Sequence, residues 1–159
     1  MSDMKGPDEW SSHQRTLIRA AVRTPGDIVE MGMGHYSSPL LSEIAAARGD
    51  RLDCYETNEA WMRALVPMLH TSTVYAHVGA YTHHLVGPNV GLVFLDGYGP
   101  SRDRWPLIAP LVKHIKTVVV HDAHRPPLKE IRSLFKYVDV VRTPYPPTLI
   151  ASHLPGVVA

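Results

Sequence analysis

Hydrophobic positions along the chain follow two alternating patterns. Short apolar runs rich in β-branched residues predict strands, and segments with apolar positions three and four residues apart predict helices. The strands are expected over 27–31, 51–56, 73–78, 90–95 and 117–120, and the helices over 9–23, 40–48, 58–68, 102–114 and 128–135. Strands that alternate with helices are typical of an α/β protein with a parallel sheet. In the first helix we expect Leu17, Ile18, Ala21 and Val22 to form the buried stripe.

The chain departs from this alternation in two places. The segment 79–89 contains glycine, proline and two adjacent histidines, and it is too short and broken for a full crossover helix. Near the end, about six residues join the expected strands 137–142 and 148–153, and so short a connection cannot hold a parallel crossover. These two strands are therefore predicted to form an antiparallel hairpin at the edge of the sheet.

A glycine-rich turn follows the first strand. Gly32 and Gly34 can adopt positive φ angles and let the main chain approach a ligand without a clash at Cβ. Ser37 and Ser38 fall where the next helix starts, just before Pro39, which the first turn of a helix tolerates. A Rossmann-type sheet binds a nucleotide with a strand, a glycine turn and a helix in this order. A tight turn that binds no ligand would show the same pattern.

The second strand ends in Glu56, about 20 residues beyond the glycines, where an acid of a Rossmann-type sheet reaches a ribose diol. A carboxylate at this point accepts two hydrogen bonds from the hydroxyls and repels a 2′-phosphate, which disfavours a phosphorylated dinucleotide. The alternative is a solvent-exposed acid at the end of a strand.

Length and composition restrict the class of protein. A chain of 159 residues suits one domain, 1–159, of which the polar residues 1–8 are expected to be flexible. A net charge of +1 indicates no basic face for a nucleic acid, and no apolar run approaches the ~20 residues of a membrane span. The only cysteine, Cys54, lies in a predicted strand, so no disulfide can form within the chain and a reducing cytoplasm is expected.

Four short motifs occur in order between about Asp27 and His153. They are EMGMGHYSS after the first strand, YET after the second, VFLDG at the fourth and VVVHD at the fifth. Together they resemble class I S-adenosylmethionine-dependent methyltransferases, and most of all small bacterial and phage-type members. The resemblance implies a three-layer, Rossmann-like α/β sandwich whose sheet is parallel except for its last strand. It also implies S-adenosylmethionine as the cofactor.

The resemblance assigns parts of the cofactor to parts of this chain. In the family the glycine turn lies against the methionine part, the acid after the second strand holds the ribose, and residues after the third strand flank the adenine. The residues implied are Glu30, Gly32, Met33, Gly34, Tyr36, Ser37 and Ser38 for the first role, Glu56 and Thr57 for the second, and Gly79 and Ala80 for the third, with Asp96 also at the cofactor. The chain lacks an asparagine-proline-proline-aromatic motif, which argues against methylation of an amino group of adenine or glutamine.

Asp96, His121 and Asp122 follow the fourth and fifth strands, whose carboxyl ends border the ligand crevice of an open α/β sheet. In one interpretation the three residues bind a divalent metal ion that orients a substrate hydroxyl, as acidic or amide groups do in catechol-type O-methyltransferases. Oxygen ligands suit Mg²⁺, whereas an imidazole shifts the preference toward Mn²⁺, Fe²⁺ or Zn²⁺.

A second interpretation of the same residues needs no metal. His121 is then the general base toward the hydroxyl, and Asp122 or Asp96 orients its ring. A third possibility is that His121 only hydrogen-bonds a neighbouring loop. Nearby, Arg102, Arg104 and Arg125 suit a phosphate or carboxylate on the substrate, or a structural role at a helix start.

The leading hypothesis is a methyltransferase that acts on a hydroxyl of a small or medium-sized substrate. The alternative is a protein that binds S-adenosylmethionine but lacks transfer activity or degrades the cofactor. A nicotinamide-dependent oxidoreductase fits less well, because the turn lacks the third glycine of the dinucleotide fingerprint. The expected partner is a small-molecule substrate, with no nucleic acid and no membrane. Because little chain is left for a lid, a homo-oligomer is expected to cover the crevice.

Overall fold

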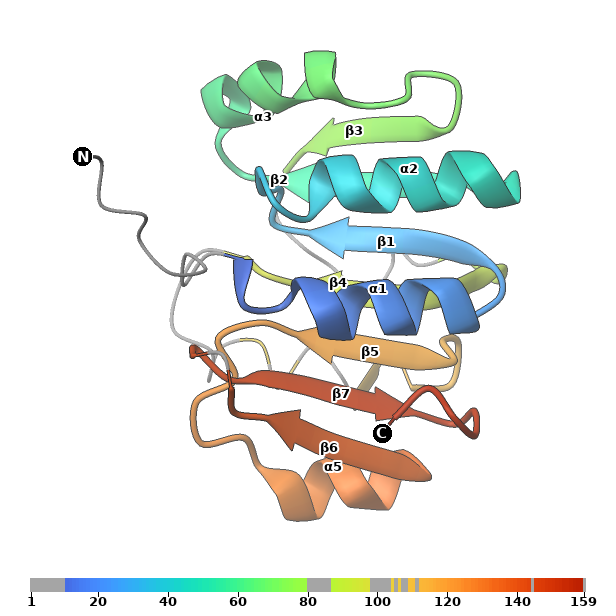
Figure 1. Ribbon diagram of the computed structural model, residues 1–159, viewed down its shortest axis with the longest axis vertical. Helices are drawn as coiled ribbons and strands as arrows, with labels where there is room; N and C mark the ends of the chain where they lie inside the picture. Colours follow the sequence, from blue (N-terminus) through green and yellow to red (C-terminus); the bar gives the residue numbers. More distant parts are fainter. Residues whose placement is uncertain are drawn as a thin grey trace, which may run out of the picture.

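A sheet of seven strands runs through the described part of the chain (Figure 1). The computed structural model describes residues 11–79, 87–97, 104, 106, 109–110, 112–143 and 145–158. The strands follow one another across the sheet in the order β3-β2-β1-β4-β5-β7-β6. Their bounds are β1 Asp27–Met31, β2 Leu52–Glu56, β3 Val74–Val78, β4 Val90–Leu95, β5 Thr117–Val120, β6 Tyr137–Val141 and β7 Thr148–Ser152.

The pairing of the strands confirms the predicted fold class. Neighbouring strands among β1 to β5 are parallel, and β7 is antiparallel to both β5 and β6. The predicted hairpin is present, with β7 inserted between β5 and β6, so β6 forms the edge of the sheet. Each predicted strand agrees with an observed strand to within one residue at either end.

Helices lie on both faces of this sheet. α1 (Gln14–Arg23), α2 (Ser38–Arg48) and α3 (Glu59–Leu65) pack against one face, and α5 (Leu128–Leu134) packs against the other. Asn58 caps α3 by accepting a hydrogen bond from the Trp61 N–H, and Pro67 lies in a 3-10 turn that follows. The segment 80–86 lies outside the described residues, as do residues 102, 103, 105, 107, 108 and 111 of the predicted helix 102–114. Within the described part, no helix has the length and apolar character needed to cross a bilayer.

Alternation along the strands divides the core into two layers. In β4, Leu92 and Phe94 belong to the layer beneath α1 and α2, whereas Val93 and Leu95 belong to the layer beneath α5. All four side chains are at most 1% exposed. A strand that is apolar on both faces requires cover on both sides, which explains why β4 lies in the middle of the sheet. Cys54 is buried in the first layer, as expected.

The buried stripe of α1 differs from the predicted one. Leu17 and Ala21 are buried as expected, but Ile18 and Val22 are 41% and 62% exposed, and Ala20 is buried in their place. The prediction for Ile18 and Val22 was therefore wrong. Two adjacent alanines let the helix approach the sheet closely, whereas larger side chains on that stripe would hold it away.

The order in which strands are added to the sheet changes direction between β1 and β4. From β1 the chain continues outward through β2 and β3, and it then returns to place β4 on the other side of β1. In open α/β sheets the ligand crevice lies at the carboxyl ends of the strands at such a switch point. Here that point lies just beyond Met31 and Leu95.

Gly32 is the residue where the two strand ends meet most closely. A Cβ at Gly32 would lie 2.5 Å from the carbonyl carbon and oxygen of Asp96, and φ is 97°. The positive φ expected of Gly32 is confirmed. The group that approaches Gly32 closely, however, is the backbone of Asp96 and Gly97 and not a ligand. Gly34 does not have a positive φ, so that expectation was wrong. Only the first glycine of the turn is required by backbone conformation.

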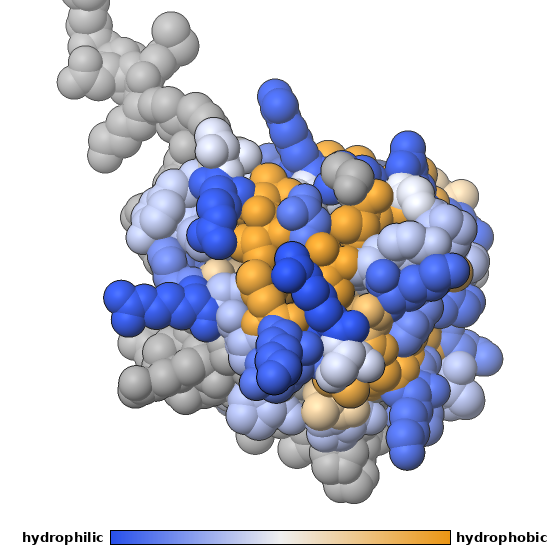
Figure 2. All heavy atoms as spheres, turned by 90° about the horizontal axis from the view of Figure 1, so that it is seen from below, coloured by the Kyte–Doolittle hydropathy of each residue, from blue (hydrophilic) through white to orange (hydrophobic). Residues whose placement is uncertain are grey.

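β6 and α5 lie at one end of the molecule (Figure 1), and Figure 2 shows the molecule from that end. All five residues of β6 are half-buried. Apolar side chains gather at the centre of this face, with polar side chains around them. An edge strand presents unpaired backbone groups along its outer side, and in the described part of the chain β6 is paired only with β7.

We expect Gly32→Ala to lower the free energy of unfolding by at least about 2 kcal/mol, because the new Cβ would collide with the Asp96 backbone. Gly49→Ala is the matched control, since Gly49 also has a positive φ of 72° but no atom lies within 4 Å of the added Cβ. Its expected loss is about 1 kcal/mol. Urea unfolding measures both values. Equal losses would show that the contact with Asp96 is not what requires glycine at position 32.

Candidate functional site

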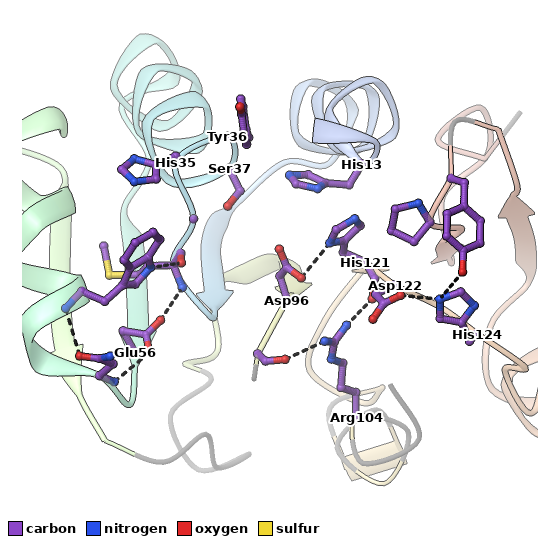
Figure 3. Close-up of a pocket in the computed structure, with 17 residues that line it drawn as sticks. His13, His35, Tyr36, Ser37, Glu56, Asp96, Arg104, His121, Asp122 and His124 are labelled. Atoms are coloured by element: carbon purple, nitrogen blue, oxygen red, sulfur yellow. Dashed lines mark hydrogen bonds and ion pairs between the residues drawn. The ribbon is translucent and has the colours of Figure 1, made fainter. Parts of the chain in front are cut away.

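A cavity of about 980 Å³ lies at the carboxyl ends of the parallel strands, at the switch point (Figure 3). This volume is at the upper end of the range for small-molecule sites, about 300–1,000 Å³. The cavity thus has room for more than one small ligand. The described residues that line it are His13, Met33, Gly34, His35, Tyr36, Ser37, Glu56, Asn58, Trp61, Asp96, Gly97, Arg104, His121, Asp122, His124, Tyr145 and Pro146.

Glu56 lies at one end of the cavity, and backbone groups fix both of its carboxylate oxygens. Oε2 accepts a hydrogen bond from the Met33 N–H at 3.2 Å, and Oε1 accepts one from the Asn58 N–H at 2.8 Å. The residue is 7% exposed. Oε2 keeps a second lone pair, and that of Oε1 faces only a long contact with the Thr57 hydroxyl at 3.4 Å. Glu56 can therefore accept two hydrogen bonds from a diol once the Thr57 hydroxyl turns away.

The glycine turn leads from β1 directly into α2. The Gly34 N–H donates to Ser38 Oγ at 3.0 Å, which holds the turn against the start of the helix. Ser37 occupies the N-cap position of α2, but its side chain makes no capping hydrogen bond. The main chain of this turn therefore borders the cavity beside Glu56.

An aromatic group stands next to the same turn. Trp61 Nε1 donates to the Met33 carbonyl at 2.8 Å, and the indole ring lies edge-on to His35 with centroids 4.8 Å apart. Trp61 is 39% exposed and lines the cavity. A flat ring with one edge anchored to backbone is suited to contact with another flat ring.

Asp96 and His121 form a hydrogen-bonded pair farther along the cavity (Figure 3). His121 Nδ1 lies 2.9 Å from Asp96 Oδ1, and its other ring nitrogen, Nε2, lies 3.0 Å from Ser12 Oγ. The His121 side chain is 5% exposed, whereas that of Asp96 is 22% exposed. Asp96 thus faces the cavity, and His121 is held behind it by both nitrogens. Of the two acids predicted to orient His121, the structure places Asp96 in contact with its ring.

His13 packs beside this pair, and the sequence analysis did not identify it. It lies just before α1, is 1% exposed, and its ring stands edge-on to that of His121 with centroids 4.4 Å apart. Neither of its ring nitrogens has a hydrogen-bond partner among the described residues. Burial, reinforced by the nearby His121, lowers the pKa of His13 to about 4. The imidazole of His13 is therefore uncharged at neutral pH.

Asp122 and Arg104 take other roles at this end of the cavity. Asp122 has a φ of 54°, and its Oδ1 lies 2.6 Å from His124 Nε2. The Arg104 guanidinium donates to the backbone carbonyls of His121 and Gly97, so it ties together the chain beyond β4 and β5. Arg104 is therefore a structural clamp at the site.

Glu30 lies beneath the glycine turn rather than in the cavity. It is fully buried, and its Oε2 accepts a hydrogen bond from the Cys54 thiol at 3.2 Å. Burial raises the pKa of Glu30 to about 7, although the Ser37 and Ser38 hydroxyls and the thiol offset part of the effect. Its other oxygen, Oε1, has no partner of ordinary hydrogen-bond geometry among the described residues. Glu30 therefore supports the glycine turn from the buried side and does not line the cavity.

Most of the predicted site residues line the cavity. Those that do are Met33, Gly34, Tyr36, Ser37, Glu56, Asp96, His121 and Asp122. Glu30, Gly32, Ser38, Thr57 and Gly79 are not among the lining residues, and Ala80 lies outside the described residues. Thr57 Oγ1 is 3.4 Å from Glu56 Oε1, and the Gly79 N–H donates to the Glu56 carbonyl.

His13, His35 and Trp61 line the cavity but are absent from the predicted site. The predicted start of the first helix at residue 9 was wrong, because α1 begins at Gln14 and His13 is its N-cap. Serine, threonine, asparagine or aspartate is the usual residue at such a position. An uncommon residue at a helix start is a reason to look for another role.

Comparisons with known proteins bear on the fold. No protein-family model and no curated protein matches the chain. Among solved structures, a methyltransferase from Geobacter sulfurreducens matches with a TM-score of 0.64 and 14% identity, over 88% of this chain and 76% of that one. The O-methyltransferase TomG from Streptomyces achromogenes, in complex with S-adenosylmethionine, matches with a TM-score of 0.59 and 17% identity, over 93% and 90%. A spermidine synthase in complex with the transition-state analogue AdoDATO matches with a TM-score of 0.66 and 14% identity, over 92% and 62%.

These matches show that the chain has the Rossmann-like fold of the class I S-adenosylmethionine-dependent methyltransferases. One of the matched structures is an O-methyltransferase. At 14% to 17% identity the likeness is one of fold alone. A spermidine synthase shares the same sheet, so the fold does not name the reaction. The reaction has to be argued from the residues of the cavity.

We expect Glu30 to make stability depend on pH. Its folded pKa of about 7 lies above the ordinary value of 4.5, so the folded state holds the proton more tightly. The stabilisation is complete below 4.5 and is lost as the pH rises toward 7. Glu30→Gln keeps the neutral shape, so at pH 8 it should be more stable than the parent by up to about 3 kcal/mol.

Urea unfolding at pH 5 and pH 8 measures this effect. Glu130→Gln, at an exposed position of α5, is the control and should leave the pH dependence as it is in the parent. A Glu30→Gln protein with the parent's pH dependence would show that Glu30 is charged in the folded state.

Proposed function

We propose that the protein transfers the methyl group of S-adenosylmethionine to a hydroxyl of a small or medium-sized substrate. The observation that carries the proposal is the presence of two differently held carboxylates in one cavity. Glu56 is fixed by two backbone N–H groups beside the glycine turn, and Asp96 is paired with His121 farther along. The Glu56 arrangement suits the binding of a ribose diol. The Asp96 arrangement suits a carboxylate that accepts a proton from the substrate.

The described residues fit S-adenosylmethionine in three respects. Glu56 has two lone pairs free of the backbone for the ribose hydroxyls. The main chain around Gly34 and Ser37 borders the space for the methionine part, and the indole of Trp61 offers a face for the purine. When bound, the cofactor supplies an activated methyl group on a sulfonium, so the protein has only to align the acceptor and receive its proton.

Asp96 is the group best placed to receive that proton. As the hydroxyl oxygen gains the methyl group, its proton has to leave, and Asp96 is the more exposed member of the Asp96–His121 pair. Both nitrogens of His121 are already engaged, one by Asp96 and one by Ser12. His121 then acts as a positioning residue, because its Nδ1 lies 2.9 Å from Asp96 Oδ1 and keeps the carboxylate at the edge of the cavity.

A protein that binds the cofactor without transferring its methyl group, or degrades it, is the second candidate. The observation in its favour is that His121 has no ring nitrogen left for a substrate. Incubation with methyl-labelled S-adenosylmethionine and a panel of phenols, catechols and sugar alcohols separates the two. Label in an acceptor supports methyl transfer. Breakdown products formed without an acceptor, or binding without consumption, would instead support the second candidate.

We expect Glu56→Gln to weaken binding of S-adenosylmethionine and S-adenosylhomocysteine by about tenfold to a hundredfold, because hydrogen bonds to a charged group contribute about 1.5–3 kcal/mol. Calorimetric titration measures the two dissociation constants. Glu59→Gln is the control, since Glu59 is exposed at the start of α3 and pairs with Arg63. Unchanged binding to Glu56→Gln would remove Glu56 from the ribose site.

With an acceptor found in that panel, Asp96→Asn should lower kcat by at least about a hundredfold, since an amide cannot receive the proton. The dissociation constant of S-adenosylmethionine should change by less than about twofold. His70→Gln, at an exposed position paired with Glu43, is the control for kcat. An Asp96→Asn protein with the parent's kcat would exclude Asp96 as the proton acceptor.

A further inference from the structure

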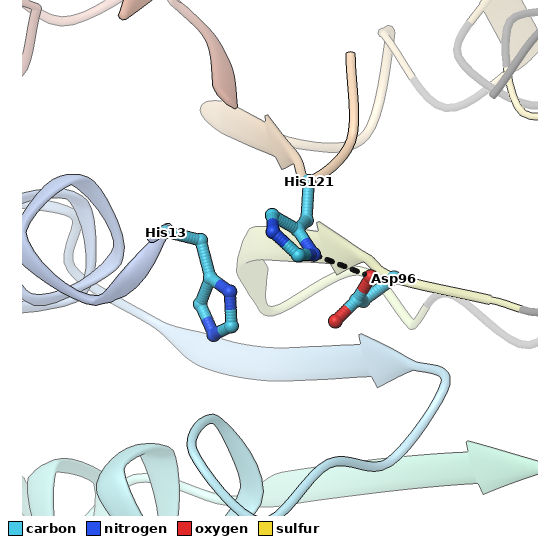
Figure 4. A group of neighbouring side chains, drawn as sticks. All are labelled: His13, Asp96 and His121. Atoms are coloured by element: carbon cyan, nitrogen blue, oxygen red, sulfur yellow. Dashed lines mark hydrogen bonds and ion pairs between the residues drawn. The ribbon is translucent and has the colours of Figure 1, made fainter. Parts of the chain in front are cut away.

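His13 has no explained role in the cavity. Both of its ring nitrogens are buried and lack a hydrogen-bond partner among the described residues, and a buried polar atom in that state destabilises the folded protein. One possible ligand atom from each of His13, Asp96 and His121 lies within 4.8 Å of the other two. Figure 4 shows the three side chains pointing into the same space from segments far apart in the sequence. We propose that these three residues bind one divalent transition-metal ion.

The spacing of Asp96 and His121 fits two ligands of one ion. Their facing atoms, Oδ1 and Nδ1, lie 2.9 Å apart. Two ligands at about 2.1 Å from an ion, at a right angle to each other, are about 3 Å apart. An ion beside the line that joins the two atoms can therefore bind both of them. His13 completes the set by turning its ring, and no hydrogen bond to a described residue has to break.

The hydrogen bonds on the far side of His121 also indicate a metal ligand. Ser12 Oγ donates its single proton to the Pro146 carbonyl at 3.1 Å, and the same oxygen lies 3.0 Å from His121 Nε2. Nε2 must then carry a hydrogen and donate it to Ser12. In a neutral imidazole, Nδ1 is left with a lone pair aimed at Asp96, and a cation between them relieves the repulsion. A histidine bound to a metal commonly donates its other N–H in this way, which fixes the ring.

The donor set decides the kind of ion. Two imidazole nitrogens and one carboxylate oxygen suit Zn²⁺, Fe²⁺, Mn²⁺ or Co²⁺, whereas Mg²⁺ prefers oxygen ligands alone. Three protein ligands also leave a coordination position open toward the cavity, where a substrate oxygen can bind.

This set differs from the predicted one, Asp96, His121 and Asp122, by one residue. Asp122 Oδ1 lies 2.6 Å from His124 Nε2, whereas the group of three possible ligands contains His13. The inference goes beyond the proposed function, since the ion needs neither cofactor nor acceptor to bind. Asp96 is shared with the proposed proton transfer, in which it acts when no ion is bound, whereas His13 belongs to the ion site alone. Zn²⁺ binding to His13→Gln therefore tests the ion site independently of methyl transfer.

The test is calorimetric titration of the chelator-treated full chain with Zn²⁺ and, separately, with Mg²⁺. We expect one strong Zn²⁺ site per chain and no comparable Mg²⁺ site. His13→Gln, Asp96→Asn and His121→Gln should each weaken Zn²⁺ binding by at least about tenfold. Asp122→Asn is the matched control and should bind Zn²⁺ like the parent, because asparagine tolerates the positive φ at this position.

Circular dichroism of each metal-free variant checks that it folds. A second measurement needs no variant, because the ¹⁵N chemical shifts of the His13 and His121 rings in the parent should change when one equivalent of Zn²⁺ is added. The chain has 10 histidines, so Zn²⁺ binding that is unchanged in His13→Gln would mark another site and overturn the proposal. Absence of the ring shifts, absence of Zn²⁺ binding, or a loss in Asp122→Asn equal to that in Asp96→Asn would also overturn it.

Discussion

The close approach of the main chain after β1 to the main chain after β4 is the constraint on which the site depends. At Gly32 there is no space for a Cβ, because the Asp96 carbonyl group occupies it. The turn therefore leaves the sheet in one direction, which brings the Met33 N–H to the Glu56 carboxylate. The same contact holds Asp96 at the edge of the cavity. One backbone contact at the switch point thus positions both carboxylates of the site.

Three acidic residues near this contact have three different environments. Glu30 is fully buried, and its raised pKa makes it a neutral support for the turn over part of the ordinary pH range. Glu56 is nearly buried, and backbone N–H groups hold both of its carboxylate oxygens. Asp96 is the most exposed of the three and pairs with an imidazole. Environment, rather than residue type, divides their roles.

The fold and the chemistry of this protein rest on different parts of the chain. The fold is shared with solved methyltransferases at 14% to 17% identity, and also with a spermidine synthase. The groups that can act on a substrate are a few side chains that line the cavity. Ser12 and His13 belong to the segment before α1 and reach the ends of β4 and β5 only because α1 lies across the sheet there (Figure 1).

The sequence by itself determined the strands, their alternation with helices, the closing hairpin and the position of Glu56, Asp96 and His121 at strand ends. These features follow from periodicity and from connection length, which are local properties of a chain. Local patterns could not decide which stripe of α1 is buried, because Ile18 and Ala20 compete through the distance between helix and sheet. Only the tertiary structure decided that Asp96 rather than Asp122 contacts the His121 ring, and that Ser12 and His13 join them. Those contacts join residues about 25 to 110 positions apart, and such separations are set by topology and packing, which no window of sequence contains.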